Sequence, residues 1–375
     1  MQTVRSKDRA RILVVATGGT IGSAGGGRGL APVADARAFL RGVLERSEGL
    51  RPDFDRFDLR FAQVGPWLSE NVHPAEDWTA LATTIARALE ADDAPDGVVV
   101  AHGTDTLAWT ASALSFLLEA PSVPIVLTGA VHPPDHPASD AGPNLRDAAL
   151  VAANEAVAGC YVVFLGAGGH GEVFRANRIV SMAPWARHFT SGDGRPLGEV
   201  RAGALHLGEE ALGALPRRAA GRAQFALHPT IDDAVKLVAV HPALRPDDLV
   251  RLAGVEGDDA EPDGRALVLD LYHSGTACTR DTEARRGSLA PAIRRCVERG
   301  VLVFGLPSDA AHAGRTIYAT TRDLLDAGMR SLPAMTREAA CTKLMWLLGQ
   351  HPGDSEAVAA AMESDLRGEV FAPAA

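Results

Sequence analysis

The chain has 375 residues, a length at which a single hydrophobic core usually gives way to two domains. Apolar residues make up 46% of it and charged residues 22%, which is ordinary for a globular protein and sufficient for a sizeable core. The net charge of -10 argues against a nucleic-acid-binding or anionic-membrane-binding surface, because an acidic protein is repelled by both.

Cysteine and histidine usage indicates neither a metal centre nor a cofactor. The four cysteines are widely spaced and form no CxxC pair, so a zinc knuckle and a disulfide framework are both unsupported. The twelve histidines show no metal-ligand spacing, and we interpret them as scattered. The first ten residues are polar and charged, and no apolar stretch approaches bilayer length. We therefore expect a cytoplasmic protein without a metal or cofactor.

The first strong predicted strand, residues 11–16, runs into a glycine pair. Gly18 and Gly19 permit backbone angles and close approaches that other residues resist. They would place the Thr20 hydroxyl at the carboxyl end of the strand, which is the edge where open α/β sheets bind ligands. The glycine-dense residues 22–29 have little to pack, and we expect them to form a mobile lid over a bound ligand.

The next predicted strand, residues 59–64, is followed by Ser69 and Glu70 before a helix opens near Pro74. Proline suits the first turn of a helix, where its missing N–H would have no partner in any case. Ser69 follows the strand and lies well before the helix, which argues against a role as a helix cap.

A second threonine-rich turn follows the strand at residues 97–101. It reads His-Gly-Thr-Asp-Thr over residues 102–106, and a helical pattern begins at once. Two such turns at neighbouring strand ends would aim Thr20, Thr104 and the Asp105 carboxylate into one crevice. The purely structural alternative is that Thr20 and Asp105 cap helices.

Strands and helices alternate through residues 160–165, and the strands are continuous in Val, Ile and Leu. This pattern predicts a parallel sheet covered by helices on both faces. Residues 166–171 match G-x-G-x-x-G, but the residues after them read as a strand where a dinucleotide site needs a helix.

The Pro/Gly/Arg-rich stretch that begins at Pro216 lacks apolar periodicity and is a candidate linker. Beyond it, strands at residues 235–241, 266–272 and 301–306 alternate with further helices. We predict an N-terminal α/β domain at residues 1–215, a linker at 216–232 and a smaller C-terminal α/β domain at 233–375.

Residues 16–21 (Ala-Thr-Gly-Gly-Thr-Ile) and 102–106 (His-Gly-Thr-Asp-Thr) resemble the two signature motifs of bacterial-type L-asparaginases. Residues 128–133 and 139–145 are similar to the family's loop after the next strand, and the two-part layout fits most of the chain. The resemblance implies the two-domain asparaginase-like α/β fold, with a larger, mostly parallel N-terminal sheet. It also implies hydrolysis of the side-chain amide of L-asparagine or of a related small amide.

The resemblance further implies a role for each site residue. Thr20 would be the nucleophile, and Thr104 and Asp105 would supply a second hydroxyl and a carboxylate. Ser69 and Glu70 would hold the α-carboxylate and α-amino groups of the substrate. Backbone amides of the glycine-rich turns are natural donors to an oxyanion or carboxylate. The implied substrate-binding set is Gly19, Ser69, Glu70, Gly103 and Ala130.

Two residues of the family's catalytic relay are missing. The family's lid usually brings a tyrosine near the nucleophile, but no tyrosine occurs between Met1 and Cys160. The family's Arg-x-Val-Thr-Lys strand matches residues 178–182, which puts Met182, a residue that cannot donate a proton, at the lysine position. A shifted register would place Arg175 there, but arginine positions charge and does not shuttle protons.

Two hypotheses of different class follow. The chain is an amidohydrolase with a substituted relay, acting on a modified or slower substrate, or it is a catalytically impaired relative that binds an amino-acid-like ligand as a sensor. In the family the small domain of one subunit completes its neighbour's site. We therefore expect a homodimer or homotetramer in which residues 271–276 face the partner's site, a small amide as ligand, and no nucleic-acid or membrane partner.

Overall fold

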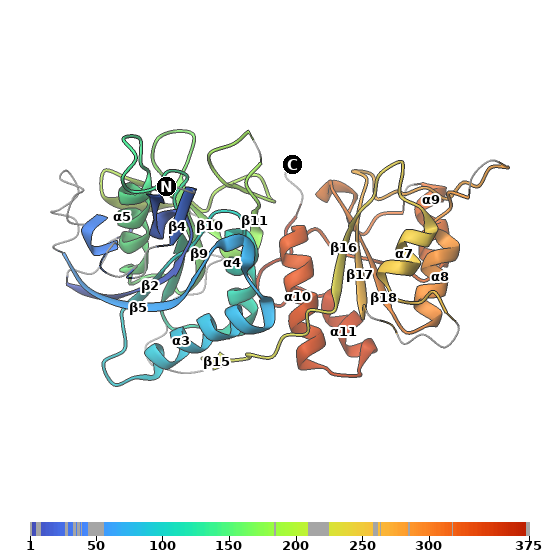
Figure 1. Ribbon diagram of the computed structural model, residues 1–375, viewed down its shortest axis with the longest axis horizontal. Helices are drawn as coiled ribbons and strands as arrows, with labels where there is room; N and C mark the ends of the chain where they lie inside the picture. Colours follow the sequence, from blue (N-terminus) through green and yellow to red (C-terminus); the bar gives the residue numbers. More distant parts are fainter. Residues whose placement is uncertain are drawn as a thin grey trace. The chain divides into compact units, whose positions relative to one another are not determined.

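The computed structural model describes residues 2–4, 9–26, 29–32, 35, 38, 40–43, 56–183, 185–208, 225–257, 262, 264–283, 286–316 and 318–372. The chain divides into two compact units, Met1–Pro229 and Thr230–Ala375. Each unit is built on its own sheet (Figure 1). Among the helices that the structure describes, none is both long enough and apolar enough to cross a membrane.

The first unit is organised around a nine-stranded sheet of order β1-β14-β13-β10-β9-β8-β6-β2-β5. Its central strands, from β5 to β9, pair in parallel, and the strands from β9 to β1 pair antiparallel. The bounds are β1 (Gln2–Val4), β2 (Ala10–Gly18), β5 (Phe57–Trp67), β6 (Gly97–Ala101), β8 (Pro124–Thr128), β9 (Gly159–Leu165), β10 (Gly171–Arg175), β13 (Gly198–Arg201) and β14 (Ala204–Leu207).

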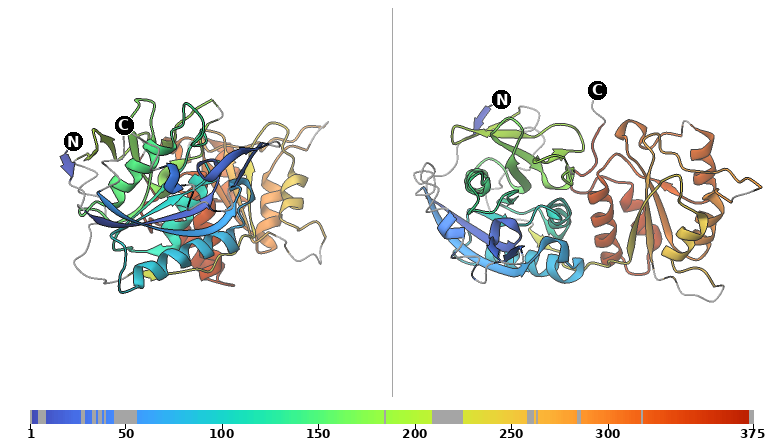
Figure 2. Two further views of the ribbon diagram at one scale, coloured as in Figure 1. Left: turned by 60° about the vertical axis from the view of Figure 1, so that its left-hand side comes forward. Right: turned by 45° about the horizontal axis from the view of Figure 1, so that its top comes forward.

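Both faces of this sheet are covered, as the continuous apolar strands predict. Helix α5 (Ala141–Ala152) packs on β6, β8 and β9 and shares one core with Val99 and Val126. Helices α3 (Thr79–Glu90) and α4 (Leu107–Leu117) cover the opposite face, as Figures 1 and 2 show. Every residue of β6 is buried, because each of its two side-chain rows meets a helix layer.

The second unit is a smaller, wholly parallel sheet of order β16-β17-β18-β19. Helices α7 and α8 share a core with it, and α10 packs against β16 and β17. The bounds are β16 (Val235–Ala239), α7 (Pro246–Leu252), β17 (Ala266–Leu271), α8 (Ala290–Glu298), β18 (Leu302–Pro307), α9 (Ala319–Asp326), β19 (Arg330–Ser331), α10 (Arg337–Gln350) and α11 (Ser355–Met362). The predicted fold class, with a larger mostly parallel sheet and a smaller α/β unit, is confirmed.

The predicted lid and the predicted linker are described only in part. The predicted lid contains β3 (Ser23–Gly26), which pairs antiparallel with β4 (Gly29–Pro32) at the lid's end, and residues 27 and 28 lie outside the described residues. Residues 209–224, which include much of the expected linker, also lie outside them. Later in the linker, β15 (Ala226–Leu227) pairs with β7 (Leu118–Glu119), which ties this stretch to the first unit.

Candidate functional site

The first threonine turn forms where β2 ends. Gly18 and Gly19 both have positive φ, +121° and +71°, a region that side chains disfavour. The Gly19 N–H donates to the carbonyl of Trp67 at 3.2 Å, so the turn is fastened to β5. Thr20 follows as the first residue of the short helix η1 (Thr20–Gly22) and is half-buried.

The second threonine turn forms at the end of β6, the strand paired in parallel with β2. A methyl group placed on Gly19 would lie 2.2 Å from the Cα atom of Gly103, so the two turns touch backbone to backbone. The structure therefore brings the turns that carry Thr20, Thr104 and Asp105 together at one sheet edge. Thr104 is half-buried and Asp105 is exposed.

Ser69 belongs to a third segment at this edge. Its side chain is buried, and a methyl group on Gly103 would lie 2.5 Å from both Cβ and Oγ of Ser69. The Thr106 hydroxyl donates to the Ser69 carbonyl at 2.7 Å. Glu70, the next residue in the short helix η2 (Ser69–Asn71), is exposed.

The loop after β8 completes the edge. A methyl group on Gly129 would lie 2.6 Å from the carbonyl oxygen of His102 and 3.5 Å from Cγ2 of Thr104. The next residue, Ala130, is fully buried. The Asp140 carboxylate accepts backbone N–H groups from Val131 and His132 at 3.0 Å, which fixes the loop's conformation. All the implied substrate-binding residues thus lie on segments that end at this edge.

The purely structural alternative does not fit these residues. The N-cap of α4 is Thr106 and not Asp105, and the residue before η1 is Gly19 and not Thr20. Ser69 lies inside η2, whose N-cap position is Leu68. None of Thr20, Ser69 and Asp105 therefore occupies an N-cap position.

His102 is a member of this region that the sequence interpretation missed. Its ring is fully buried, with Nδ1 2.8 Å from the Gly103 carbonyl oxygen and Nε2 3.0 Å from the Thr110 hydroxyl. The Trp78 indole N–H donates to that hydroxyl at 2.9 Å. Burial lowers the pKa of His102 to about 4, even though the bond to Gly103 opposes the shift.

The donors and acceptors in this series of hydrogen bonds can be assigned in only one way. The indole only donates and the Gly103 carbonyl only accepts, so Thr110 donates to Nε2 of a neutral His102 whose Nδ1–H points at Gly103. The sequence signal was the position of His102 inside the motif. A single histidine between a buried strand and a glycine is otherwise indistinguishable from a scattered one.

Met182 follows β11 (Ile179–Val180) and is half-buried. The short helix η4 (Ala176–Arg178) and β11 both pack against α4, the helix that follows the second threonine turn. Arg178, at the start of the proposed register, pairs with Asp193 at 3.1 Å. Within the described residues, no three His, Cys, Asp or Glu side chains converge as a metal site requires.

The edge therefore presents hydroxyl groups, a solvent-accessible carboxylate and the backbone of two glycine turns. These are the groups that acyl transfer from an amide needs: a nucleophile, a route for its proton and hydrogen-bond donors.

Comparison with known proteins agrees with this arrangement. Residues 11–212 match the family model described as Asparaginase, N-terminal. The chain is 34% identical over 366 residues to the L-asparaginase of Thermococcus kodakarensis, covering 96% of this chain and 99% of that protein. It is 31% identical over 377 residues to one subunit of the glutamyl-tRNA(Gln) amidotransferase of Metallosphaera sedula, covering 96% of this chain and 76% of that protein.

Among solved structures, the thermostable L-asparaginase from Thermococcus kodakarensis superposes with a TM-score of 0.77 at 29% identity, covering 96% of this chain and 99% of that one. At this coverage the match extends over both units, and the family model spans both threonine turns. Sequence and fold agree along nearly the whole length, and the chain belongs to the asparaginase family.

Proposed function

We propose that the protein hydrolyses the side-chain amide of L-asparagine or of a closely related small amide, with Thr20 as the nucleophile. The observation that carries this proposal is the backbone contact between Gly19 and Gly103, which keeps Thr20 beside the turn of Thr104 and Asp105. Such fixed proximity of reacting groups is a large part of what an enzyme supplies.

In the proposed reaction Thr20 Oγ forms a bond to the amide carbon. Its proton passes through the Thr104 hydroxyl and the Asp105 carboxylate to the leaving nitrogen, which departs as ammonia. Backbone N–H groups of the glycine turns stabilise the oxyanion. Water then attacks the acyl-threonine ester, releasing the carboxylic acid and restoring Thr20. Ser69 and Glu70 hold the α-carboxylate and α-amino groups of the substrate.

A non-catalytic binding function is the second candidate, and one specific observation favours it. In the register that puts Met182 at the lysine position, the proton route lacks a group able to donate a proton. The resemblance to part of a tRNA amidotransferase adds a further possibility for the enzyme, an amide carried on a larger molecule.

Ammonia release from L-asparagine, L-glutamine and a panel of small amides tests the proposal. We expect steady turnover of at least one amide by the wild type and loss of that turnover in Thr20→Ala. Thr84→Ala is the matched control, because the Thr84 hydroxyl donates to the Ala80 carbonyl one turn earlier in helix α3, away from both threonine turns. Ligand binding without ammonia release from any amide would replace the enzyme proposal with the sensor.

A further inference from the structure

Thr106 uses its hydroxyl in an unusual way for its position. It is the N-cap residue of α4, where a threonine commonly accepts a hydrogen bond from the N–H two or three residues on. No such capping bond is formed here. The hydroxyl instead donates at 2.7 Å to the carbonyl of Ser69, 37 positions earlier in the chain.

This bond and one other contact fix Ser69 from the same turn. The Thr106 hydroxyl donates a hydrogen bond to the Ser69 carbonyl. The Ser69 side chain packs against Gly103, where any side chain larger than hydrogen would collide with it. The position of the Ser69 hydroxyl is therefore set by the second threonine turn and not only by its own backbone. Ser69 is also buried, so water competes little for these contacts.

A separate link holds the far end of the segment that begins at Ser69. The Trp78 indole donates to Thr110, which bonds to His102, and His102 bonds to the Gly103 carbonyl. Loss of the Thr106 bond would leave this second link in place. The segment would stay docked while the Ser69 end alone gained freedom to shift.

We propose that Thr106 is a positioning residue for the substrate's α-carboxylate, acting through Ser69. The inference rests on the role of Ser69 in the proposed function. The α-carboxylate does not take part in bond breaking, and a hydrogen bond that only anchors it contributes equally to the ground state and the transition state. Loss of such binding raises KM and leaves kcat unchanged.

Thr106→Val removes the hydroxyl and keeps the shape, and Thr106→Ser keeps the hydroxyl. We expect Thr106→Val to raise KM for L-asparagine about tenfold, with kcat within about twofold of the wild type, as for one positioned hydrogen bond. Thr106→Ser should restore the wild-type KM. For 3-aminopropanamide, which lacks the α-carboxylate, KM should be the same in the wild type and in Thr106→Val.

The opposite pattern would overturn the inference: a fall in kcat at constant KM, no change in KM, or an equal rise in KM for both amides. Calorimetric binding of L-aspartate, the product, separates this inference from the proposed function. If the wild type releases no ammonia, a tenfold weaker Kd for L-aspartate in Thr106→Val still supports positioning. An unchanged Kd, or no binding of L-aspartate by the wild type, overturns it. Matching thermal melts for both variants show that the fold is intact.

Discussion

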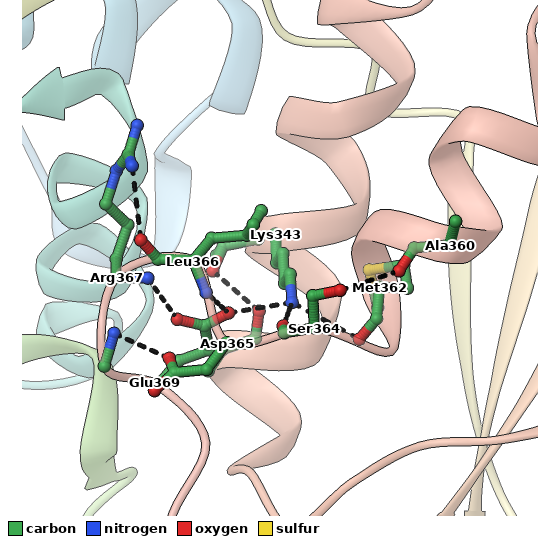
Figure 3. Close-up of polar contacts among 11 residues, drawn as sticks. Lys343, Ala360, Met362, Ser364, Asp365, Leu366, Arg367 and Glu369 are labelled. Atoms are coloured by element: carbon green, nitrogen blue, oxygen red, sulfur yellow. Dashed lines mark hydrogen bonds and ion pairs between the residues drawn. The ribbon is translucent and has the colours of Figure 1, made fainter.

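Lys343 Nζ lies 2.7 Å from Glu369 Oε1 in an ion pair whose two side chains are fully shielded from solvent. The ammonium also donates to the carbonyls of Met362 and Ser364, and the carboxylate accepts N–H groups from Leu366 and Arg367 (Figure 3). Burial raises the pKa of Glu369, but Lys343 and these N–H donors more than offset it, so this pKa lies below its usual value. The pair thereby fixes the chain after α11 to the side of α10.

Glu369→Gln removes the carboxylate that pairs with the buried Lys343 ammonium, and leaves Asp365 as an acidic group that still acts on it. Removal of one partner of a buried pair costs about 3–5 kcal/mol of unfolding free energy. The matched control is Glu363→Gln, because the Arg330–Glu363 pair lies at 3.2 Å but is half-exposed, and such pairs contribute about 0–1 kcal/mol. Urea unfolding of the two variants measures the difference in unfolding free energy. Equal losses in the two variants would show that the buried pair stabilises the protein no more than the exposed pair.

His102 predicts a dependence of stability on pH. Its pKa is about 4 in the folded protein and about 6.5 unfolded, so the unfolded chain binds the extra proton between these values. The contribution of neutral, buried His102 to the free energy of unfolding is about 3 kcal/mol. It is fully present above about pH 6.5 and is lost as the pH falls towards 4.

His102→Asn keeps a donor near Nδ1 but has no group that titrates in this range. Urea unfolding at pH 4.5 and pH 7.5 should show a smaller loss of stability in this variant than in the wild type. Parallel pH profiles for the two proteins would contradict the shifted pKa.

The sequence predicted which segments meet at the edge of the candidate site, because parallel strands have their carboxyl ends at one edge of a sheet. It did not predict the contacts between those segments. The Thr106 bond to Ser69 depends on how two segments 37 residues apart in the sequence pack against each other. From the sequence alone, a threonine just before a helix predicts only an N-cap. Lys343 likewise sits in an ordinary helical pattern, and its burial depends on a carboxylate 26 positions later.

Gly19→Ala should abolish activity. The added methyl would meet the Gly103 Cα at 2.2 Å in a region of positive φ, so the two threonine turns must separate. We expect a loss of at least about 2–3 kcal/mol of stability from strain and overpacking. Gly300→Ala is the control, because Gly300 also has positive φ, +82°, but its added methyl meets nothing within 4 Å.

That control should cost only about 1 kcal/mol and leave ammonia release unchanged. If Gly19→Ala retained wild-type turnover, close contact between the turns would not be needed for function.

The turn after β17 leads to a prediction about assembly. Gly275 at φ +70° closes the turn, its carbonyl accepts the Thr321 hydroxyl, and Tyr272 stays exposed. We propose that this turn faces the site of a second subunit in a homodimer or homotetramer. Light scattering at micromolar concentration should then give at least twice the chain mass of 39.3 kDa. A fully active monomer would rule out a shared site.

Met182→Lys separates the two candidate functions. A lysine at this position would follow closely on β11, which packs against α4, and if it reaches the Asp105 carboxylate its charged form is favoured. If the pocket has the geometry of an amidohydrolase with a weakened relay, the new lysine should raise asparagine hydrolysis by about 10²–10⁴-fold, the usual gain from general acid–base help. Met182→Gln is the control, because it adds polarity without a titratable group.

If the pocket is instead shaped for a different ligand, Met182→Lys should weaken the native activity or binding, since the new ammonium group would have no complementary group on that ligand. An unchanged rate and an unchanged affinity would place the family's lysine position elsewhere in residues 175–182.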